Sequence, residues 1–364
     1  MENKKVFNDT VHGFIELPEL CVKIIDTPPF QRLRYLKQLG FCYYVFPGAT
    51  HTRFAHSIGV CWLAGLWLSH LQLKQSNLGI TDKEILLVQI AGLLHDIGHG
   101  PYSHTFELFI HNARPDLEYS HEKQTLKIIK DYGASGILSD DDISFISSII
   151  VGNLPTRAFL GHIIHNPING LDADKLDYFT RDSQCTSFKI GCDIQRIIYE
   201  SFVIDDEIVF ASKIKGDIWT IYETRFRLYR DLYFHKTVCK IEDLMIQTLL
   251  EADAIGVFNF NGVKLSESID NVDNFMLTND DILGQMERHS NPIIRANVKK
   301  LHTRNFETNE KIEKIKIERI AHYGMKSKNP MLFVKFVDKF NKVPVTLPES
   351  ILNTFCPKEF EVII

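Results

Sequence analysis

The sequence has no long hydrophobic run, no excess of basic residues and no regular spacing of cysteine. Its longest apolar stretch, residues 58–68, is too short to cross a bilayer, which needs about 20 residues. Lys and Arg number 41 against 46 Asp and Glu, so the basic character of duplex DNA-binding proteins is missing. The seven cysteines include no C-x-x-C pair, which indicates reduced thiols rather than a disulfide framework.

The N-terminal run MENKK also lacks the apolar segment of a signal peptide. We therefore expect an intracellular protein, cytoplasmic or nuclear, without a membrane partner. Local basic clusters could still hold phosphates, so nucleic acid is not excluded as a partner, although the charge balance does not indicate one.

Glycine and proline, at 20 and 13 residues, are too few for a collagen-like or low-complexity chain, and 45% hydrophobic residues exclude a disordered one. Helical periodicity dominates from about residue 30 to residue 250. Thr81 and Glu84 have the spacing of a capping box, just before an apolar run that ends at residue 94. The pattern predicts further helices over residues 52–71, 121–132, 141–151, 171–182, 193–203 and 217–250.

The character of the sequence changes beyond residue 252. Residues 259–274 are loop-like, 278–304 are again helical, and 314–345 alternate as strands do. We predict a mostly α fold: a helical core over residues 1–252, with an extended N-terminal segment before residue 20, and a smaller α+β lobe over residues 253–364.

The strongest chemical signal is the run HDIGHGP at residues 95–101, where the buried helix ends. Asp96 is an ionisable group in a place where burial is costly unless the group is paired or binds a metal. His95 and Asp96 could be a helix cap and a solvated acid, but histidines recur at positions 99, 104, 111 and 121, and His56 lies upstream. This clustering favours a site.

A zinc-protease motif is the competing interpretation, because His95 and His99 are four residues apart as in H-E-x-x-H. Aspartate here replaces the glutamate, and Gly98 and Pro101 break the helix that would align the two histidines. His99 is therefore expected to support the site or to face a phosphate, not to bind the metal.

Two other segments carry candidate residues. In the helix over residues 171–182, Lys175, Tyr178 and Asp182 share a face; the alternative is a solvated face with an Asp177–Arg181 pair. Further on, Arg225 leads a stripe with the tyrosines at positions 229 and 233, which suits a phosphate and a stacked base but equally suits an ordinary amphipathic helix.

Taken in order, these motifs resemble the HD-domain superfamily of metal-dependent phosphohydrolases. The closest resemblance is to the deoxynucleoside triphosphate triphosphohydrolases that carry a sterile alpha motif beside the HD domain. The resemblance covers essentially the whole chain and rests on KVFND (5–9), IDTP (25–28), FQRLRY (30–35), KQLG (37–40), YYVFPGA (43–49), RFAHS (53–57), QIAGL (89–93), HDIGHGP (95–101), SH (103–104) and DKLDYF (174–179).

The resemblance implies a set of site residues, each at the position that matches the family's motif. The implied metal ligands are His56, His95, Asp96 and Asp174. The implied catalytic residues are Arg53, His99, His104, Glu107 and His121. The implied substrate contacts are Gln38 and Leu39 at the deoxyribose, Lys175, Tyr178 and Arg225 at the phosphates, and Asp182 and Tyr233 at the base. The implied allosteric nucleotide site comprises Lys5, Val6, Asn8, Asp26, Gln31 and Arg34.

The implied activity is hydrolysis of a dNTP to a deoxynucleoside and inorganic triphosphate. Two imidazoles and two carboxylates suit one mid-row divalent ion, Fe, Mn or Zn, while Mg would accompany the triphosphate. The family also implies GTP or dGTP as activator and a homo-oligomer, dimer or tetramer. The alternatives are an HD phosphohydrolase acting on another nucleotide, and a non-catalytic binder of nucleotides or single-stranded nucleic acid.

Three departures from the family pattern qualify these expectations. Tyr229 stands where the family has His, Ala211 where it has Arg, and Thr308 where it has Lys. The last two positions belong to a second nucleotide site, of which Lys213 and Arg304 are retained. We therefore predict that nucleotide-dependent assembly of a tetramer is weakened or replaced by a constitutive oligomer.

Overall fold

The computed structural model describes residues 4–306, 319–338, 343–348 and 361–363, and this part of the chain is mostly helical. The chain begins with an antiparallel hairpin of β1 (Lys4–Asp9) and β2 (Gly13–Pro18). Short helical turns follow: α1 (Glu19–Ile25), α2 (Pro28–Gln31), η1 (Arg32–Tyr35) and η2 (Gly40–Tyr44). The extended start expected from the sequence is confirmed.

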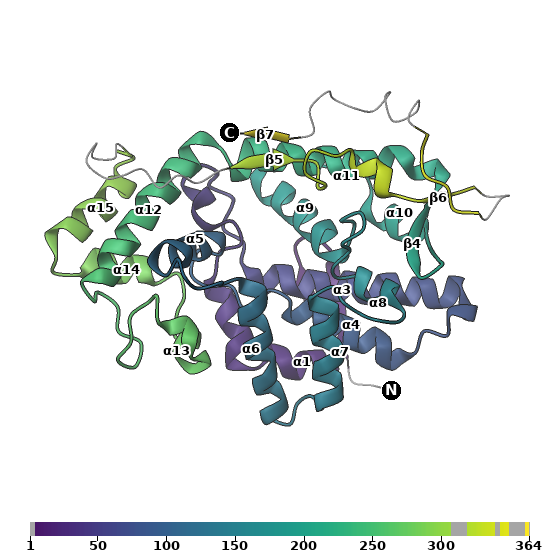
Figure 1. The fold of residues 1–364 in the computed structure, drawn as a ribbon, viewed down its shortest axis with the longest axis horizontal. Coiled ribbons are helices and arrows are strands. Elements are labelled where there is room, and N and C mark those ends of the chain that lie inside the picture. Colours follow the sequence, from purple (N-terminus) through teal and green to yellow (C-terminus); the bar gives the residue numbers. More distant parts are fainter. Residues whose placement is uncertain (1–3, 307–318, 339–342, 349–360, 364) are drawn as a thin grey trace.

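Two long helices form the centre of the molecule, α3 (Arg53–Lys74) and α4 (Asp82–Leu94), which pack side by side (Figure 1). The short turn η3 (Ser76–Leu78) connects them. The Thr81 hydroxyl accepts from the Glu84 amide and the Glu84 carboxylate accepts from the Thr81 amide, so the expected capping box is confirmed. Most of the α4 residues are buried, as their apolar character predicts.

Helix α3 alone, among the described residues, is long and apolar enough to cross a membrane by length and composition. Its apolar window has a mean hydropathy of 1.2, and 72% of it is buried inside the fold. Trp67 of this helix is fully buried and donates its indole N–H to Ser201 at 2.7 Å. The helix therefore serves as the central core helix, to which the other layers attach.

The remaining helices of the first two thirds surround this pair. They are α5 (His104–Ala113), α6 (His121–Ala134), α7 (Asp140–Ile150), α8 (Ala158–His162), α9 (Ala173–Thr186), α10 (Ile194–Tyr199), η4 (Ser212–Ile214), α11 (Lys215–Leu228), the π-helical turn η5 (Tyr229–Tyr233) and α12 (Lys236–Ala254). Helix α9 packs against α3, and α12 packs against α5.

Two helix predictions are wrong in this region. The helix expected over 193–203 ends at Tyr199, and the chain turns into an antiparallel pair, β3 (Ser201–Ile204) and β4 (Glu207–Ala211). The helix expected over 217–250 is interrupted by the π-helical turn and by His235, where α12 begins. The first helix gives way to a hairpin that turns at Asp205 and Asp206, both with positive φ, and β4 also pairs with β6 (Phe336–Val337), far along the chain.

The last third forms a helical group and small strands. Its elements are η6 (Ser268–Asp270), α13 (Val272–Met276), α14 (Ile282–Arg288), α15 (Pro292–His302), β5 (Ile320–His322), η7 (Pro330–Phe333), β6 and β7 (Glu361–Ile363). Helices α14 and α15 pack with α12 at one end of the molecule, and the β3–β4–β6 sheet lies at the other (Figure 1).

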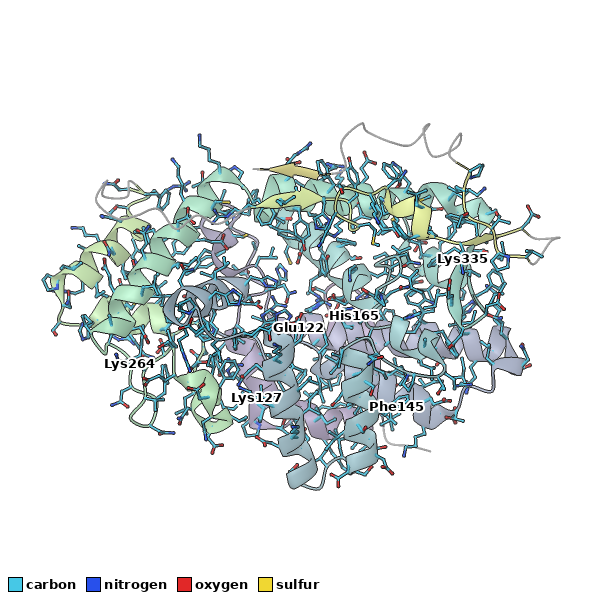
Figure 2. The ribbon with its side chains drawn as sticks, viewed as in Figure 1. Glu122, Lys127, Phe145, His165, Lys264 and Lys335 are labelled. Atoms are coloured by element: carbon cyan, nitrogen blue, oxygen red, sulfur yellow. The ribbon has the colours of Figure 1, made fainter. Side chains whose placement is uncertain are left out.

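Lys264 and Lys335 mark these two ends in Figure 2. The helices within 278–304 are thus confirmed, although Asn291 separates them by capping α15. Residues 259–274 are loop-like except for η6 and the start of α13. Of the strands expected over 314–345, β5 and β6 are present, and Thr308 lies outside the described residues.

Candidate functional site

The end of α4 places His95 and Asp96 at the centre of the molecule. His95 caps the helix, and its Nδ1–H donates to the Gly92 carbonyl at 2.7 Å. This hydrogen bond fixes the tautomer, because the other ring nitrogen, Nε2, must then carry a lone pair. Asp96, the next residue, is 4% exposed.

His56 reaches the same point from the first turns of α3. Its Nδ1–H donates to the Asp177 carboxylate at 2.8 Å, so in the neutral ring the lone pair is on Nε2. That Nε2 atom lies 3.1 Å from an oxygen of Asp174 and 3.5 Å from an oxygen of Asp96. Asp174 comes from the first turn of α9, which follows from the packing of α9 on α3.

The four side chains fit a divalent cation. The Nε2 atoms of His56 and His95 are buried and have no hydrogen-bond partner among the described residues. These two nitrogens and a carboxylate oxygen of Asp174 all lie within 4.8 Å of one another. His95 Nε2 also lies 3.5 Å from each of Asp96 and Asp174. Two imidazole nitrogens and two carboxylates that converge in this way suit a divalent metal ion.

The electrostatics of this cluster favour a positive charge at its centre. Burial opposes protonation of His56, but the surrounding carboxylates of Asp174, Asp177 and Asp96 outweigh it and raise the pKa of His56 to about 10. Burial also opposes ionisation of Asp96, yet Arg53, His95 and His99 hold its pKa well below the usual range. The carboxylates are therefore ionised at neutral pH, and either protons or a cation must balance them.

His56, His95, Asp96 and Asp174 are called the metal-type cluster below. Arg53 connects this cluster to the loop that follows α4. Its guanidinium pairs with Asp96 and donates from Nε to the Ser103 hydroxyl at 2.9 Å. Ser103 in turn donates to the Lys37 carbonyl at 2.9 Å. Tyr102 and Ser103 both have a φ of 56°, a strained conformation for residues with a side chain. Asp280 holds this turn by accepting from the Tyr102 amide at 2.7 Å.

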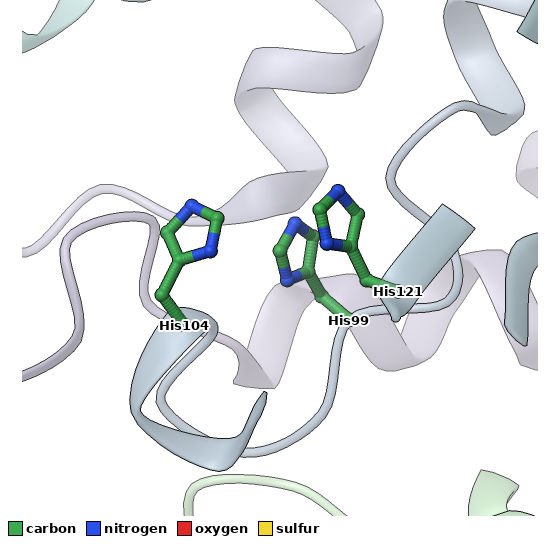
Figure 3. Close-up of side chains that lie close together, drawn as sticks. All are labelled: His99, His104 and His121. Atoms are coloured by element: carbon green, nitrogen blue, oxygen red, sulfur yellow. The ribbon is translucent and has the colours of Figure 1, made fainter. Parts of the chain in front are cut away.

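Beside the metal-type cluster lie three imidazoles from three segments, His99, His104 and His121 (Figure 3). The rings of His99 and His121 stack with centroids 3.9 Å apart, and the His104 ring meets them edge-on. Gly98 permits this arrangement, since a Cβ there would lie 2.2 Å from the His121 carbonyl oxygen. The loop and the start of α6 are therefore in direct contact.

Glu107 binds two of these rings. Its Oε2 accepts from His121 Nδ1 at 3.2 Å and lies 3.5 Å from His104 Nδ1. Burial disfavours its ionised form, but the hydrogen bonds and charges of both histidines outweigh that and lower its pKa. Burial and the charges of Arg53 and His121 hold the pKa of His99 well below its usual value, so that ring is neutral.

These residues open into a cavity of about 590 Å³, which is the size of a small-molecule site. Most of the predicted catalytic and substrate residues line it: Gln38, Leu39, Arg53, Asp96, His99, His104, Glu107, His121, Asp174, Lys175, Tyr178, Asp182, Arg225 and Tyr233. Tyr229 lines it as well. His111, part of the histidine clustering in the sequence, lines the cavity too, and its ring also bonds to the Tyr119 carbonyl at 2.9 Å.

The wall of the cavity that is formed by α9, α11 and η5 is held by ion pairs and hydrogen bonds. Tyr233 donates to Asp182 at 2.6 Å, and Lys175 pairs with Asp172 at 2.8 Å. The guanidinium of Arg225 lies over the Tyr229 ring, 4.1 Å from its centroid. The alternative of a solvated face is therefore wrong for the helix over residues 171–182, where Asp177, Arg181 and Asp182 are buried. The Arg225 stripe lines the cavity, and its binding of a phosphate and a base stays a prediction.

The Asp177–Arg181 pair predicted by that alternative does exist, at 2.9 Å, but both side chains are buried. Asp177 faces His56 and not solvent. The carboxylate belongs to the core of the site.

The candidate nucleotide residues near the N-terminus, called the N-terminal group below, lie on β1 and on the segment from the end of α1 to η1. Lys5, Val6 and Asn8 are exposed on β1, which lies beside α1. Arg34 donates to Gln31 at 2.7 Å and stacks on the Phe54 ring at 3.5 Å. The remaining member, Asp26, is exposed at the C-terminal end of α1.

Four further residues touch the site and were missed by sequence reasoning. His51 donates to Asp182 at 2.7 Å, and His12 donates to Asp177 at 2.6 Å. Glu242 and Arg319 line the cavity from α12 and from the segment before β5. The four missed residues lie outside the motifs that mark this region in the sequence, so spacing alone could not reveal them.

Comparison with known proteins agrees with this geometry. The HD domain family model matches residues 53–151. The chain is 38% identical over 84% of its length to the deoxynucleoside triphosphate triphosphohydrolase SAMHD1 homolog of Dictyostelium discoideum. It is 33% identical over 99% of its length to SAMHD1 of Bos taurus and 38% identical over 81% to that of Homo sapiens. The chain spans 59%, 76% and 52% of these three relatives, respectively.

The fold and the site therefore define an HD-domain hydrolase with a place for a divalent metal. The helical core, the converging His and Asp side chains and the lined cavity all conform to that class. More narrowly, the chain belongs to the SAMHD1 family of deoxynucleoside triphosphate triphosphohydrolases.

Proposed function

We propose that the protein hydrolyses dNTPs to a deoxynucleoside and inorganic triphosphate in the cavity described above. The observation that carries this proposal is the juxtaposition of a metal-type donor set with a cavity of about 590 Å³ lined by cationic and imidazole side chains. Membership of a family whose relatives are named for this activity supports it.

His56, His95, Asp96 and Asp174 would hold the metal, which we propose to be Fe, Mn or Zn. Such an ion supplies Lewis acidity toward a phosphoryl oxygen and lowers the pKa of a nearby water. Mg would accompany the triphosphate, because it favours phosphate oxygens. Arg53 pairs with Asp96 and so helps to hold a ligand of this set in place.

Lys175, Tyr178 and Arg225 would bind the phosphates. Lys175 and Arg225 are cationic, and each lies at the wall of the cavity with a partner that fixes it. Burial and the charges of Arg225 and Lys326 lower the pKa of His322 to about 4, so the ring beside Arg225 adds no charge of its own. Fixed cations of this kind stabilise the charge that develops on the phosphate oxygens during attack at the α-phosphorus.

The 5′-oxygen is a poor leaving group and needs a proton. His104 would donate it, since its side chain is 68% exposed toward the cavity and an imidazole can donate near neutral pH. Glu107 would orient the His104 ring, and His121 and His99 would support that carboxylate by hydrogen bonding and stacking.

Gln38 and Leu39 would contact the sugar, so that packing against the ring disfavours a 2′-hydroxyl. Asp182 and Tyr233 would contact the base. Both pairs line the same cavity as the phosphate-binding residues.

GTP or dGTP would act as the activator at Lys5, Val6, Asn8, Asp26, Gln31 and Arg34. The carboxylate of Asp26 suits the Watson–Crick edge of guanine, and the Arg34 guanidinium suits its O6. This site would lie between the subunits of a dimer or tetramer.

Product analysis tests the proposal directly. Chromatography of each dNTP after incubation, with Fe, Mn, Zn and Mg varied, is expected to yield triphosphate and deoxynucleoside. Release of monophosphate or of pyrophosphate would indicate an HD phosphohydrolase of another class. No turnover at full metal occupancy would indicate a nucleotide or nucleic-acid binder.

A further inference from the structure

A buried carboxylate behind the metal-type cluster joins it to the N-terminal hairpin. Asp177 lies on α9 and is fully buried. One of its oxygens accepts from His56 Nδ1 at 2.8 Å, and the other accepts from His12 Nε2 at 2.6 Å. Arg181 binds both oxygens, at 2.9 and 3.0 Å. Each carboxylate oxygen of Asp177 thus accepts two hydrogen bonds.

His12 is held as firmly as the carboxylate that it binds. Asp9 accepts from the His12 amide at 2.9 Å, which closes the turn between β1 and β2. Arg181 also donates to Asp9 at 3.0 Å, so one guanidinium ties the turn to Asp177. The imidazole of His12 packs on Trp62 of α3, with ring centroids 4.8 Å apart.

The approach of α9 to α3 depends on Gly59. A Cβ at this position would lie 1.9 Å from Asp177 Oδ1 and 2.5 Å from Arg181 Nη2. Only a residue without a side chain allows the carboxylate to sit beside the turn of α3 that carries His56.

We propose that His12 and Asp177 are positioning residues for the metal ligand His56, so that the turn of the N-terminal hairpin forms part of the metal site. The proposal rests on the metal ligation proposed above. The Asp177 hydrogen bond selects the tautomer of His56 that presents Nε2 to the metal and sets the angle of the ring. His12 holds the carboxylate in the orientation that makes this bond. Partners of ligating histidines are typically worth 10- to 100-fold in metal affinity or activity.

The test compares His12→Leu with His12→Gln. Glutamine can place an amide N–H near the position of His12 Nε2, whereas leucine cannot donate. The matched control is Gln184→Ala, which removes the 2.9 Å bond from Gln184 to the Thr10 carbonyl. That bond ties the same turn to the same helix but does not touch Asp177.

Metal affinity is measured on the full chain by equilibrium competition with a chelator. The visible spectrum of the Co²⁺-substituted protein reports the ligand geometry. His12→Leu is expected to bind metal about 10- to 100-fold more weakly and to shift the Co²⁺ bands. His12→Gln and Gln184→Ala are expected to match the wild type in both measurements.

The proposal is overturned if His12→Leu, folded by circular dichroism, keeps the wild-type affinity and spectrum, or if Gln184→Ala changes them equally. If His12→Leu does not fold, His12→Phe takes its place, since phenylalanine keeps a ring against Trp62 but cannot donate to Asp177, and the same results support or overturn the proposal. None of these measurements needs a nucleotide. A failure of dNTP hydrolysis would therefore be distinguishable from a failure of this inference.

Discussion

The Oε2 atom of Glu107 lies 3.2 Å from the Nδ1 atom of His121, and this contact connects the two helices that carry His104 and His121 of the three clustered imidazoles. Helix α5 supplies the carboxylate and α6 supplies the ring. The same oxygen faces His104, so a single carboxylate orients both rings. The Glu107 carboxylate thereby holds His104, the proposed general acid on the same helix, at the wall of the cavity.

Replacement of His104 by alanine should lower kcat by about 10²- to 10⁴-fold, the usual contribution of a general acid. Metal content should not change, because His104 is not among the four proposed ligands. Asn112→Ala is the matched control, since Asn112 is exposed on the same helix and bonds only to the Leu108 carbonyl. Full activity of His104→Ala at unchanged metal content would contradict its role.

Replacement of His95 by alanine should abolish turnover and most of the thermal stabilisation that metal provides. A ligand at 100 times its Kd stabilises a protein by about 2.7 kcal/mol. Thermal melts with and without added metal, together with metal analysis, measure the loss. An increase in Tm on metal addition that is the same in His95→Ala as in the wild type would refute the ligand assignment.

Replacement of Leu39 by alanine should relax the discrimination against ribonucleotides, because space opens beside the sugar. A change of this size in an apolar contact is worth about 1–3 kcal/mol, so the ratio of ATP to dATP turnover should rise at least about tenfold. The dATP rate of the variant is the internal control. Comparable wild-type turnover of ATP and dATP would already refute selection by packing.

Glu242 should make the folded protein more stable at acidic than at neutral pH. Burial outweighs the attraction of Arg319 and the hydrogen bond from Thr105, and it raises the pKa of Glu242 to about 7. An unfolded chain releases this proton near pH 4.3, so between these values the folded state binds a proton that the unfolded state has lost. Stability contributed by Glu242 is therefore present below about pH 4.3 and declines as the pH rises to about 7.

Glu242→Gln removes this titration and should flatten the dependence. The side chain is 18% exposed, so we expect solvent to limit the effect to about 1–2 kcal/mol. Melts of wild type and variant from pH 4.5 to pH 8 measure it, with Glu251→Gln on the same helix as the control. A difference in Tm between wild type and Glu242→Gln that does not vary with pH would contradict the assignment.

GTP or dGTP should bind at the N-terminal group, and nucleotide-dependent assembly of a tetramer should be weak or replaced by a constitutive oligomer. Asp26→Ala should weaken GTP binding at least about tenfold, as loss of a charged hydrogen bond does. Glu19→Gln on the same helix, in a surface pair with Lys23, is the control. Titration calorimetry and light scattering with and without GTP and a dNTP measure both effects. A sharp nucleotide-induced tetramer would show that the second site is intact.

The helical core and the central motif could be predicted because their signals are local. The capping box at Thr81 and the apolar run to Leu94 decide helix α4, and HDIGHGP directly follows it. The β3–β4 hairpin turns locally at Asp205 and Asp206, but its strand β4 also pairs with β6 more than 100 residues away, and that pairing could not be predicted. Burial of Asp177 follows in the same way from packing of α9 on α3 and not from its own neighbours.

The contact of His12 with Asp177 also depends on long-range packing. The two residues are 165 positions apart, and His12 stands in a run that reads as a simple turn. Nothing in the spacing of either segment indicates that one would orient the other. Long-range packing supplied this part of the site.

Hydrolysis of a dNTP in water enriched in ¹⁸O tests the central claim most directly. Attack of water at the α-phosphorus with departure of the 5′-oxygen should place one labelled oxygen in the triphosphate and none in the deoxynucleoside. Mass spectrometry of both products reads the result. Label in the 5′-hydroxyl, or label in a monophosphate in place of triphosphate, would contradict the account.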